Sequence, residues 1–364
     1  MGSAAAARLA ARGANVLGLE QFALGHDLGA SSGRTRIIRR AYFESPRYVP
    51  LLERAYALWH ELEAATATTL LDLCGLLVVG PNDGDAPRGV ALASERFGIP
   101  VEMLSPSQLV RRWPQFCLGD GEIALFEAGA GVVFPERAIA AMQAHARECG
   151  ATLRGDAPVT SWEAHGRGMR VHVADASAID ADRVVVTAGP WLGEIARSLA
   201  LPLVVQRNVQ LWFEPATAGF GREDFPAFFL ERAGLPGPLY GFPDFGDGLK
   251  AALHGAGEAT RADDLDRSVR DEDERRVRAA LSPFLPGAAG ALRSGKACMY
   301  ALTPDAHFAI GSDPRDANVV VAGGFSGHGF KFAPVVGEIV AELVLDGRTA
   351  FDIEFLGLHR LLGA

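Results

Sequence analysis

The first twenty residues, MGSAAAARLAARGANVLGLE, restrict the fold more than any other stretch of this sequence. They predict an alanine-rich helix, a glycine stop and a buried strand that ends in an acid. In a dinucleotide-binding βαβ unit, such a helix lies close to the sheet, its first N–H groups meet a pyrophosphate, and the acid binds a ribose. Gly2 can be the last glycine of that unit and Glu20 the acid. An alanine-rich surface helix followed by a chance glutamate explains the stretch equally well.

A chain of 364 residues is too long for one ordinary hydrophobic core, so we expect two domains or two interleaved lobes. Its formal net charge of -9 argues against nucleic acid as a partner. The cysteines are widely spaced and form no CxxC pair, which argues against a zinc site or a disulfide framework and fits a reducing compartment. The beginning of the sequence has neither a long apolar run nor a basic segment. We therefore expect no membrane span, no metal site and a cytoplasmic location.

Hydrophobic spacing along the chain predicts alternating helices and strands. Helices are predicted over 4–12, 48–64, 135–150 and 261–285, strands over 15–21 and 183–191, and a β-rich region over 206–253. Near the end, NVVVAGGFSGHGFKF predicts a strand and a glycine loop, and an amphipathic helix follows. Elements of the nucleotide-binding type thus lie at both ends and in the middle. The sequence therefore predicts a cofactor domain assembled from separate segments.

The stretch TRIIRRAY places arginines in an apolar context that resembles a β-strand. If it is extended, Arg36 and Arg40 lie on one face and Arg39 on the other. An arginine directed inward could bind a carboxylate through two parallel hydrogen bonds. An exposed basic edge strand is the alternative and, without further context, the better interpretation.

In GFSGHGFKF, three glycines let the backbone approach a planar ligand closely. The helix that follows directs its positive end at this loop, where it would stabilise negative charge on a ring system. His328 and Lys331 are candidate ligand contacts, and the alternative is a flexible turn with a solvated lysine. Cys298, taken alone, is more typical of a small buried side chain than of a catalytic one.

Four stretches together resemble the monomeric sarcosine oxidase family: GRTRIIRRAY, YGFPDFGDGLKAALH, KACMYALTPDAHFAIG and GGFSGHGFKF. These are FAD-dependent oxidases of N-methyl amino acids, with N-methyltryptophan oxidase and pipecolate oxidase as relatives. The resemblance covers nearly the whole chain, and the combination of CMY with FSGHGFKF is specific. It implies an α/β fold, α+β overall: a Rossmann-like FAD-binding domain without its first strand, and a second, mostly antiparallel β-sheet substrate domain. The implied FAD-binding domain comprises 1–80, 135–205 and 300–364, and the substrate domain 81–134 and 206–299.

The resemblance also implies roles for single residues. Cys298 would bind the flavin covalently as a thioether, Arg39 and Lys331 would hold the substrate carboxylate, and Lys250 would lie where oxygen is reduced. The other implied catalytic residues are His254 and Tyr240 at the amine and Arg36 beside the flavin ring. The other implied substrate contacts are Phe229, Tyr300, Gly327 and His328. The other implied cofactor contacts are Gly2, Glu20, Ser32, Thr35, Gly189, Trp191, Phe325 and Gly329, of which Phe325 would also form part of the substrate wall.

The implied reaction oxidises an N-methyl or ring C–H bond next to the amine, and water hydrolyses the resulting imine, to formaldehyde and an amino acid for N-methyl substrates. Oxygen then reoxidises the flavin and becomes hydrogen peroxide. The expected partners are an amino acid substrate and O2, and a monomer is expected. Two alternatives remain open: an FAD dehydrogenase that uses another electron acceptor, against which Lys250 argues, and an inactive remnant that binds no flavin.

Three features depart from the family pattern. Phe229 stands where the family's sarcosine oxidases carry methionine, which alters the wall around the amine. The turn FGDG is one residue shorter. The chain starts at the last glycine of the nucleotide-binding motif, so we expect a shortened start that lacks the first strand and two glycines. We therefore expect this chain to fold poorly or to hold FAD weakly.

Overall fold

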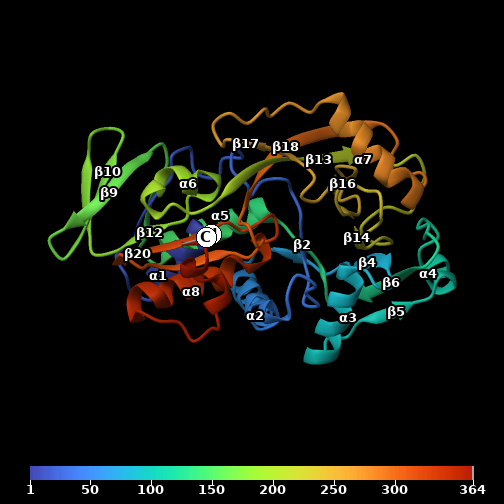
Figure 1. The fold of residues 1–364 in the computed structure, drawn as a ribbon, viewed down its shortest axis with the longest axis horizontal. Helices are drawn as coiled ribbons and strands as arrows, with labels where there is room; N and C mark the ends of the chain where they lie inside the picture. The colour runs from blue at the N-terminus through green and yellow to red at the C-terminus, as the bar shows by residue number, and fades with distance from the viewer. Residues whose placement is uncertain (363–364) are drawn as a thin grey trace.

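The computed structural model describes residues 1–362. Figure 1 shows the helices α1, α5 and α8 together near the middle of the molecule. A large sheet with α7 on it lies on one side of them, and the hairpin of β9 and β10 extends on the other. The predicted fold class is confirmed: short parallel pairs with helices form one part, and a mostly antiparallel sheet forms the other.

The helical part contains α1 (Gly2–Ala11), α2 (Val49–Thr66), α5 (Pro135–Glu148) and α8 (Ala333–Asp346). Small residues allow these helices to approach one another. A Cβ atom added to Gly337 of α8 would lie 2.7 Å from the backbone carbon of Ala4, so only glycine fits there. The alanine-rich sequence of α1 therefore forms a buried helix, and not the surface helix that the sequence also allowed.

Two strand pairs of this part face each other across a gap. β1 (Leu17–Leu19) runs parallel to β8 (Thr152–Arg154), and β12 (Val184–Val186) runs parallel to β20 (Asp316–Gly323), which also pairs with β19 (Ala309–Asp313). Within residues 1–362, neither β1 nor β12 has a partner on its other edge. In space the strands follow one another as β8, β1, an open position, β12 and β20. This arrangement matches the doubly wound order 3-2-1-4-5 with the position of strand 1 open.

The larger sheet has nine strands and provides one wall of the site. Its order is β17 (Glu258–Thr260), β13 (Val204–Phe213), β16 (Leu249–Leu253), β15 (Leu239–Phe242), β14 (Ala227–Leu230), β4 (Leu76–Pro81), β6 (Glu122–Glu127) and β5 (Glu102–Leu104), with β18 (Leu292–Leu302) also paired to β13. All pairs are antiparallel except β14 with β4. α7 (Asp271–Phe284) packs on one face of this sheet.

Alternation along the strands divides the sheet between two cores. In β14, Phe228 packs with Phe284 of α7, whereas Phe229 belongs to the core shared with the helical part. Successive side chains of a strand point to opposite faces, so these neighbouring phenylalanines separate. The core on the Phe229 side is the one that borders the candidate site.

Smaller elements complete the fold. They are β2 (Arg36–Ile38), β3 (Leu71–Asp72), β7 (Gly131–Val133), β9 (Val159–His165), β10 (Gly168–Val173), β11 (Ala178–Ala181), α3 (Asp85–Phe97), α4 (Pro106–Arg112) and α6 (Leu192–Ile195). None of the helices in residues 1–362 combines the length and the apolar character that crossing a bilayer requires.

Most predicted elements are confirmed, but some have other bounds than predicted. The helix predicted over 261–285 begins only at Asp271, because the Asp266 side chain accepts hydrogen bonds from the Ser268 backbone and hydroxyl and forms a turn. The strand predicted over 15–21 is only three residues long. The division into two domains stays a prediction. The strand β4 spans the first predicted boundary, at residue 80, and lies in the nine-stranded sheet.

Candidate active site

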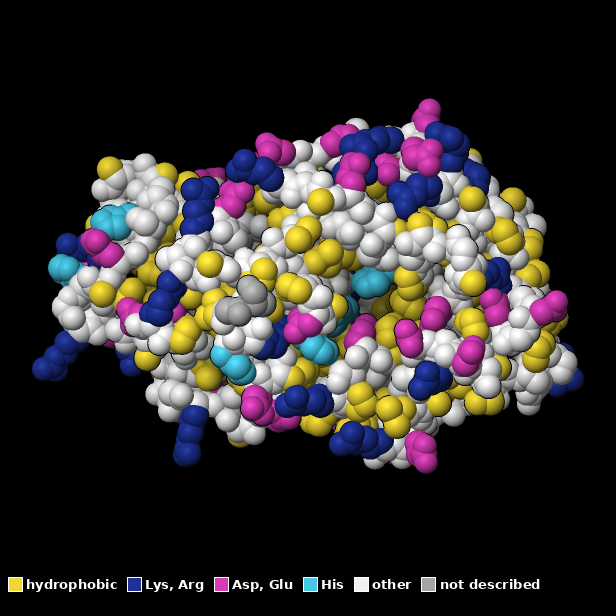
Figure 2. Space-filling model, in the orientation of Figure 1, with side chains coloured by type: hydrophobic (Ala, Val, Ile, Leu, Met, Phe, Trp, Pro, Cys, Tyr) yellow, Lys and Arg dark blue, Asp and Glu magenta, His cyan; other side chains and the backbone are white. Residues whose placement is uncertain are grey.

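A cavity of about 1520 Å³ connects the helical part with the nine-stranded sheet. Residues of α1, β1 and β12 line one end of it, and residues of β14, β15 and β18 line the other. In Figure 2, histidine side chains lie near the middle of this face, between the two parts. Of the predicted site residues, fifteen border this cavity: Gly2, Glu20, Arg36, Arg39, Gly189, Trp191, Phe229, Tyr240, His254, Tyr300, Phe325, Gly327, His328, Gly329 and Lys331.

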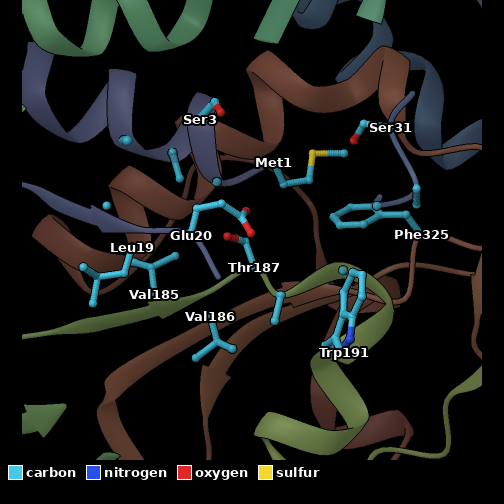
Figure 3. Close-up of a pocket in the computed structure, with 18 of the residues that line it drawn as sticks. Met1, Ser3, Leu19, Glu20, Ser31, Val185, Val186, Thr187, Trp191 and Phe325 are labelled. Carbon is cyan, nitrogen blue, oxygen red and sulfur yellow. The ribbon is translucent and has the colours of Figure 1, made fainter. Parts of the chain in front are cut away.

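The first end of the cavity has the features of a nucleotide site. Glu20 and Thr187 point toward the same space beside Met1 (Figure 3). A Cβ atom on Gly2 would lie 2.7 Å from the Thr187 hydroxyl, so the start of α1 lies very close to the end of β12. The Glu20 carboxylate accepts a hydrogen bond from the Phe22 backbone at 3.1 Å, which holds it at the end of β1. This geometry fits a ribose at Glu20 and a pyrophosphate at the start of α1.

At the other end, sheet register gathers residues that are distant in the sequence. Tyr240 of β15 is paired with Phe229 of β14 on one side and with Ala252 of β16 on the other. Paired residues share a face of a sheet, so Lys250, two residues before Ala252, lies on this face as well. His254 lines the cavity directly after β16.

Arg39 is a buried cation with an unused donor. Its Nη2 atom donates to both carboxylate oxygens of Glu44, at 2.7 and 2.6 Å. Its Nε atom is buried and has no hydrogen-bond partner in the described part of the chain. Burial alone would raise the pKa of Glu44, but nearby positive charge, above all that of Arg39, outweighs it and lowers this pKa to about 2. Arg39 thus points inward, and the exposed-edge alternative is wrong for it.

Lys331 is the second cation of this end and comes from the glycine loop before α8. Its Nζ atom is buried and donates to the His328 carbonyl at 2.7 Å. Burial lowers the pKa of Lys331 to about 7, and the charge of Arg39 is the second-largest cause. The loop is therefore a structured part of the site, and the alternative of a solvated lysine on a flexible turn is wrong.

His328 positions this loop through both ring nitrogens. Nε2 lies 2.9 Å from the Ala306 carbonyl and therefore donates to it, so Nδ1 accepts from the Tyr42 hydroxyl at 2.6 Å. Burial lowers the pKa of His328 to about 3, so the ring is neutral. His328 lines the cavity, but its polar atoms are bound within the protein.

Polar aromatic groups form the wall opposite the cations. The His254 Nδ1 atom lies 3.2 Å from the Tyr300 hydroxyl. Burial lowers the pKa of His254 to about 4 and raises that of Tyr300 well above its usual range. It also raises the pKa of Tyr240 to about 12. At neutral pH these three groups therefore carry no charge.

Four predicted site residues do not border the main cavity: Ser32, Thr35, Lys250 and Cys298. Thr35 and Lys250 line a second cavity. The Ser32 hydroxyl donates to the Asp27 carbonyl. Cys298 is buried, and its sulfur accepts a hydrogen bond of 3.0 Å from Gln210, which does border the main cavity.

The sequence interpretation did not select three residues that the structure places at the site. Glu44 follows Arg39 by five positions, Tyr42 holds His328, and Gln210 holds Cys298. An acid close to a candidate arginine clamp was the only available signal, and it concerned Glu44. Within residues 1–362 no group of three or more His, Cys, Asp or Glu side chains is arranged to hold a metal.

The chain is similar to known enzymes over nearly its whole length. A monomeric sarcosine oxidase of Streptomyces avermitilis is 40% identical over 371 residues, which cover 100% of this chain and 96% of that protein. An N-methyl-L-tryptophan oxidase of Yersinia pestis is 36% identical over 366 residues, covering 99% of this chain and 96% of that protein. The structure of NikD, an unusual amino acid oxidase essential for nikkomycin biosynthesis, matches with a TM-score of 0.84 at 24% identity, covering 98% of this chain and 94% of the other.

These comparisons confirm the resemblance that the four sequence stretches indicated. The family described as FAD dependent oxidoreductase matches residues 1–343. The cavity lined by Gly2, Glu20 and Thr187 agrees with that family's cofactor. The chain therefore belongs to the FAD dependent oxidoreductase family, among its amine oxidases, which act on CH–NH groups with oxygen as acceptor.

Proposed function

We propose that this protein is an FAD-dependent oxidase of N-methyl or cyclic secondary amino acids and that it produces an imine and hydrogen peroxide. The observation that carries the proposal is the buried Arg39 with its unused Nε donor, in the same cavity as Lys331. Glu44 balances one of these two positive charges, so a further anion can be accommodated, and a substrate carboxylate fits. The names of the two relatives contain sarcosine and N-methyl-L-tryptophan. Each of these molecules has both a secondary amine and a carboxylate.

Residues at the first end of the cavity would hold FAD. Glu20 would accept hydrogen bonds from the ribose, and the pyrophosphate would face the N–H groups at the start of α1, beside Gly2. When bound, FAD supplies the two-electron oxidation that no side chain provides. The remaining task of the protein is to bind, orient and deprotonate the amine.

Arg39 and Lys331 would hold the carboxylate from two chain segments and so fix the position of the neighbouring amine. Their positive charge also lowers the pKa of a bound ammonium group, which favours the neutral amine that oxidation requires. Because burial lowers the pKa of His254 to about 4, its ring stays neutral and adds no charge near the amine. Phe229 would limit the size of the group that fits between this ring and the Arg39 side chain.

The proposal is tested by mixing the FAD-containing protein, without oxygen, with sarcosine, N-methyltryptophan or pipecolate. We expect at least one of them to bleach the visible flavin absorbance. Admission of air should restore the absorbance and yield one hydrogen peroxide per amine oxidised. If none of the secondary amino acids bleaches the flavin, the proposed function is wrong. Bleaching that air does not reverse would identify a dehydrogenase instead.

Carboxylate binding should depend on pH through Lys331. In the free protein, burial and, to a smaller extent, the charge of Arg39 lower the pKa of Lys331 to about 7. A bound carboxylate favours the protonated form of this lysine. Affinity for an amine-free carboxylate such as methoxyacetate should therefore be highest below pH 7. It should fall by up to about tenfold per pH unit above it. Titration of the flavin absorbance with methoxyacetate between about pH 6 and pH 9 measures this.

Two variants control this pH dependence. Lys331→Met should bind the carboxylate more weakly and with no pH dependence in this range. Lys296→Met removes a lysine that pairs with Asp27 outside the main cavity, and it should keep the wild-type profile. A wild-type profile in Lys331→Met would assign the pH dependence to another group.

A thioether between Cys298 and the flavin is also part of the proposal. Cys298 is buried next to Gln210, which borders the cavity, and it lies two residues from Tyr300 on the same face of β18. After acid precipitation, flavin colour should stay with the wild-type pellet and move to the supernatant in Cys298→Ala. Cys149→Ala should behave as wild type. A colourless wild-type pellet with a yellow supernatant would show that the protein binds FAD but has no covalent link to it.

Two further points belong to this proposal. The protein is expected to be a monomer, which light scattering of the FAD-containing protein would test. Its location in the cytoplasm is likewise a proposal, and fractionation of the source cells would test it.

A further inference from the structure

Phe43 lies behind the wall of the main cavity and contacts two of the residues that form this wall. Its ring centre is 3.9 Å from the guanidinium carbon of Arg39 and 4.9 Å from the ring centre of Phe229. Arg39 and Phe229 both line the cavity. An aromatic ring attracts a guanidinium group held against its face, and two aromatic rings at this distance attract each other. One side chain therefore supports both the cation for the carboxylate and the apolar wall beside it.

Helix α3 holds Phe43 from the side away from the cavity. A Cβ atom added to Gly89 of α3 would lie 2.6 Å from the Cα, Cβ and carbonyl oxygen atoms of Phe43. Only glycine lets the helix approach the Phe43 backbone this closely. Glycine is unfavourable in the interior of a helix, and this contact explains its presence in α3. The backbone of Phe43 therefore has no room to move toward α3.

Phe229 lies between the carboxylate end of the cavity and the polar aromatic wall. Its ring centre is 5.8 Å from the guanidinium carbon of Arg39 and 6.5 Å from the centre of the His254 ring. Its backbone is paired on both sides, with Tyr240 of β15 and with Val78 of β4. The strand pairing fixes the backbone of Phe229, and Phe43 occupies the space into which its ring could withdraw. This part of the wall is therefore rigid.

A rigid wall at this place distinguishes amino acids by the group on their α-carbon. In the proposed function, the carboxylate binds Arg39 and Lys331, and the amine lies near His254. The α-carbon joins the carboxylate to the amine, so a group attached to it comes close to Phe229. Close-packed side chains do not yield to added bulk without strain. Hydrogen on the α-carbon fits beside this wall, whereas an aromatic side chain would have to displace it.

We propose that Phe43 is a specificity-determining residue, which holds Phe229 in the cavity wall and so favours N-alkylglycines over secondary amino acids with an aromatic side chain. The inference rests on the proposed function and narrows its substrate class. Phe43 acts through Phe229 and Arg39 and does not itself line the cavity. Its removal should therefore change which molecules bind, in addition to any effect on the stability of the fold.

Two carboxylates without an amine test this selection without turnover. Methoxyacetate has only hydrogen on its α-carbon, whereas 2-methoxy-3-phenylpropanoate carries a benzyl group there. Titration of the flavin absorbance of the FAD-containing protein measures both Kd values. The Kd of wild type should be at least about tenfold lower for methoxyacetate, because the benzyl group meets the rigid wall.

Phe43→Ala should reduce this preference for methoxyacetate by about fivefold or more, because Phe229 can then withdraw into the vacated space. Phe43→Leu keeps a smaller apolar side chain and should give an intermediate preference; it serves also if the alanine variant does not fold. Phe97→Ala removes a phenylalanine from the exposed end of α3 and should keep the wild-type preference.

A double-variant cycle separates selection from a purely structural role. In a protein that already carries Phe229→Ala, the further change Phe43→Ala should alter the preference less than about twofold, because Phe43 acts through Phe229. A purely structural role would lower the thermal midpoint of Phe43→Ala and leave the preference unchanged.

Equal Kd values for the two carboxylates in wild type would overturn the proposal. A wild-type preference in folded Phe43→Ala or Phe43→Leu would overturn it as well. If neither carboxylate binds, the cavity has no carboxylate site at Arg39, and this inference fails together with that part of the proposed function. If the carboxylates bind as expected but no secondary amino acid bleaches the flavin, the proposed function alone is wrong.

Discussion

Replacing Arg39 by methionine should lower kcat/KM for the amino acid substrate by about 10²- to 10³-fold. The change removes a buried charge that would be hydrogen-bonded to the substrate carboxylate, and such a loss costs about 2–5 kcal/mol. Much of the effect should appear in KM, because the carboxylate contact exists before the amine reacts. Steady-state oxygen consumption over a range of amine concentrations measures both constants.

The control for this prediction is the neighbouring arginine. Arg40 stacks on Tyr56 and pairs with Glu53 outside the cavity, so Arg40→Met should keep kcat/KM within about threefold. Arg39→Met leaves Glu44 without its partner and could unfold the protein for that reason. The double variant Arg39→Met with Glu44→Gln replaces the pair by neutral groups. If this double variant is folded and retains wild-type kcat/KM, Arg39 does not bind the carboxylate.

Joining an apolar strand and a glycine turn to the amino group of Met1 should raise the thermal midpoint by about 5 °C or more and increase FAD content. The edges of β1 and β12 border one cavity, and a parallel strand between them would satisfy their free backbone groups. Val184 and Val185 are only half-buried, although a central strand of three valines would normally be covered on both sides. The Met1 amino group is itself buried, which lowers its pKa to about 6.

The matched control is an extension of equal length made of serine, glycine and lysine. It cannot bury apolar side chains between the two strands, so its midpoint and its flavin content should equal those of the original chain. Scanning calorimetry and the ratio of flavin to protein absorbance measure the two effects. Equal midpoints for the apolar and the polar extension would show that the gap does not accept a strand.

Local sequence predicted the elements whose signals are local. The alanine run and the glycine stop predicted α1, and the apolar spacing predicted α2 and α5, because a helix is decided by neighbours three and four positions apart. The same reasoning failed over 261–270, where acidic and small residues form a turn through a side-chain hydrogen bond. Charge and helix propensity alone do not reveal that a side-chain hydrogen bond to the backbone competes with helix formation there.

The site depended partly on local motifs and partly on the folded chain. GFSGHGFKF suggested Lys331 as a ligand contact, and the family resemblance implied that Arg39 and Lys331 together hold the substrate carboxylate. That both are buried in one cavity follows from the packing of the β2 segment beside the loop before α8. Glu44, which pairs with Arg39, was not identified because no spacing rule connects the two residues in an irregular loop.

By itself, then, the sequence determined the family, the helices with strong periodicity and the residue types of the site. The resemblance implied Phe229, but its position was decided by the tertiary structure: the register of β14 with β15 directs Phe229, and not its neighbour Phe228, to the main cavity. The tertiary structure also decided that Lys250 borders a cavity separate from that of Arg39. The physical reason is that strand residues alternate between faces, so one step of register exchanges the two faces, and pairing between distant segments sets that register.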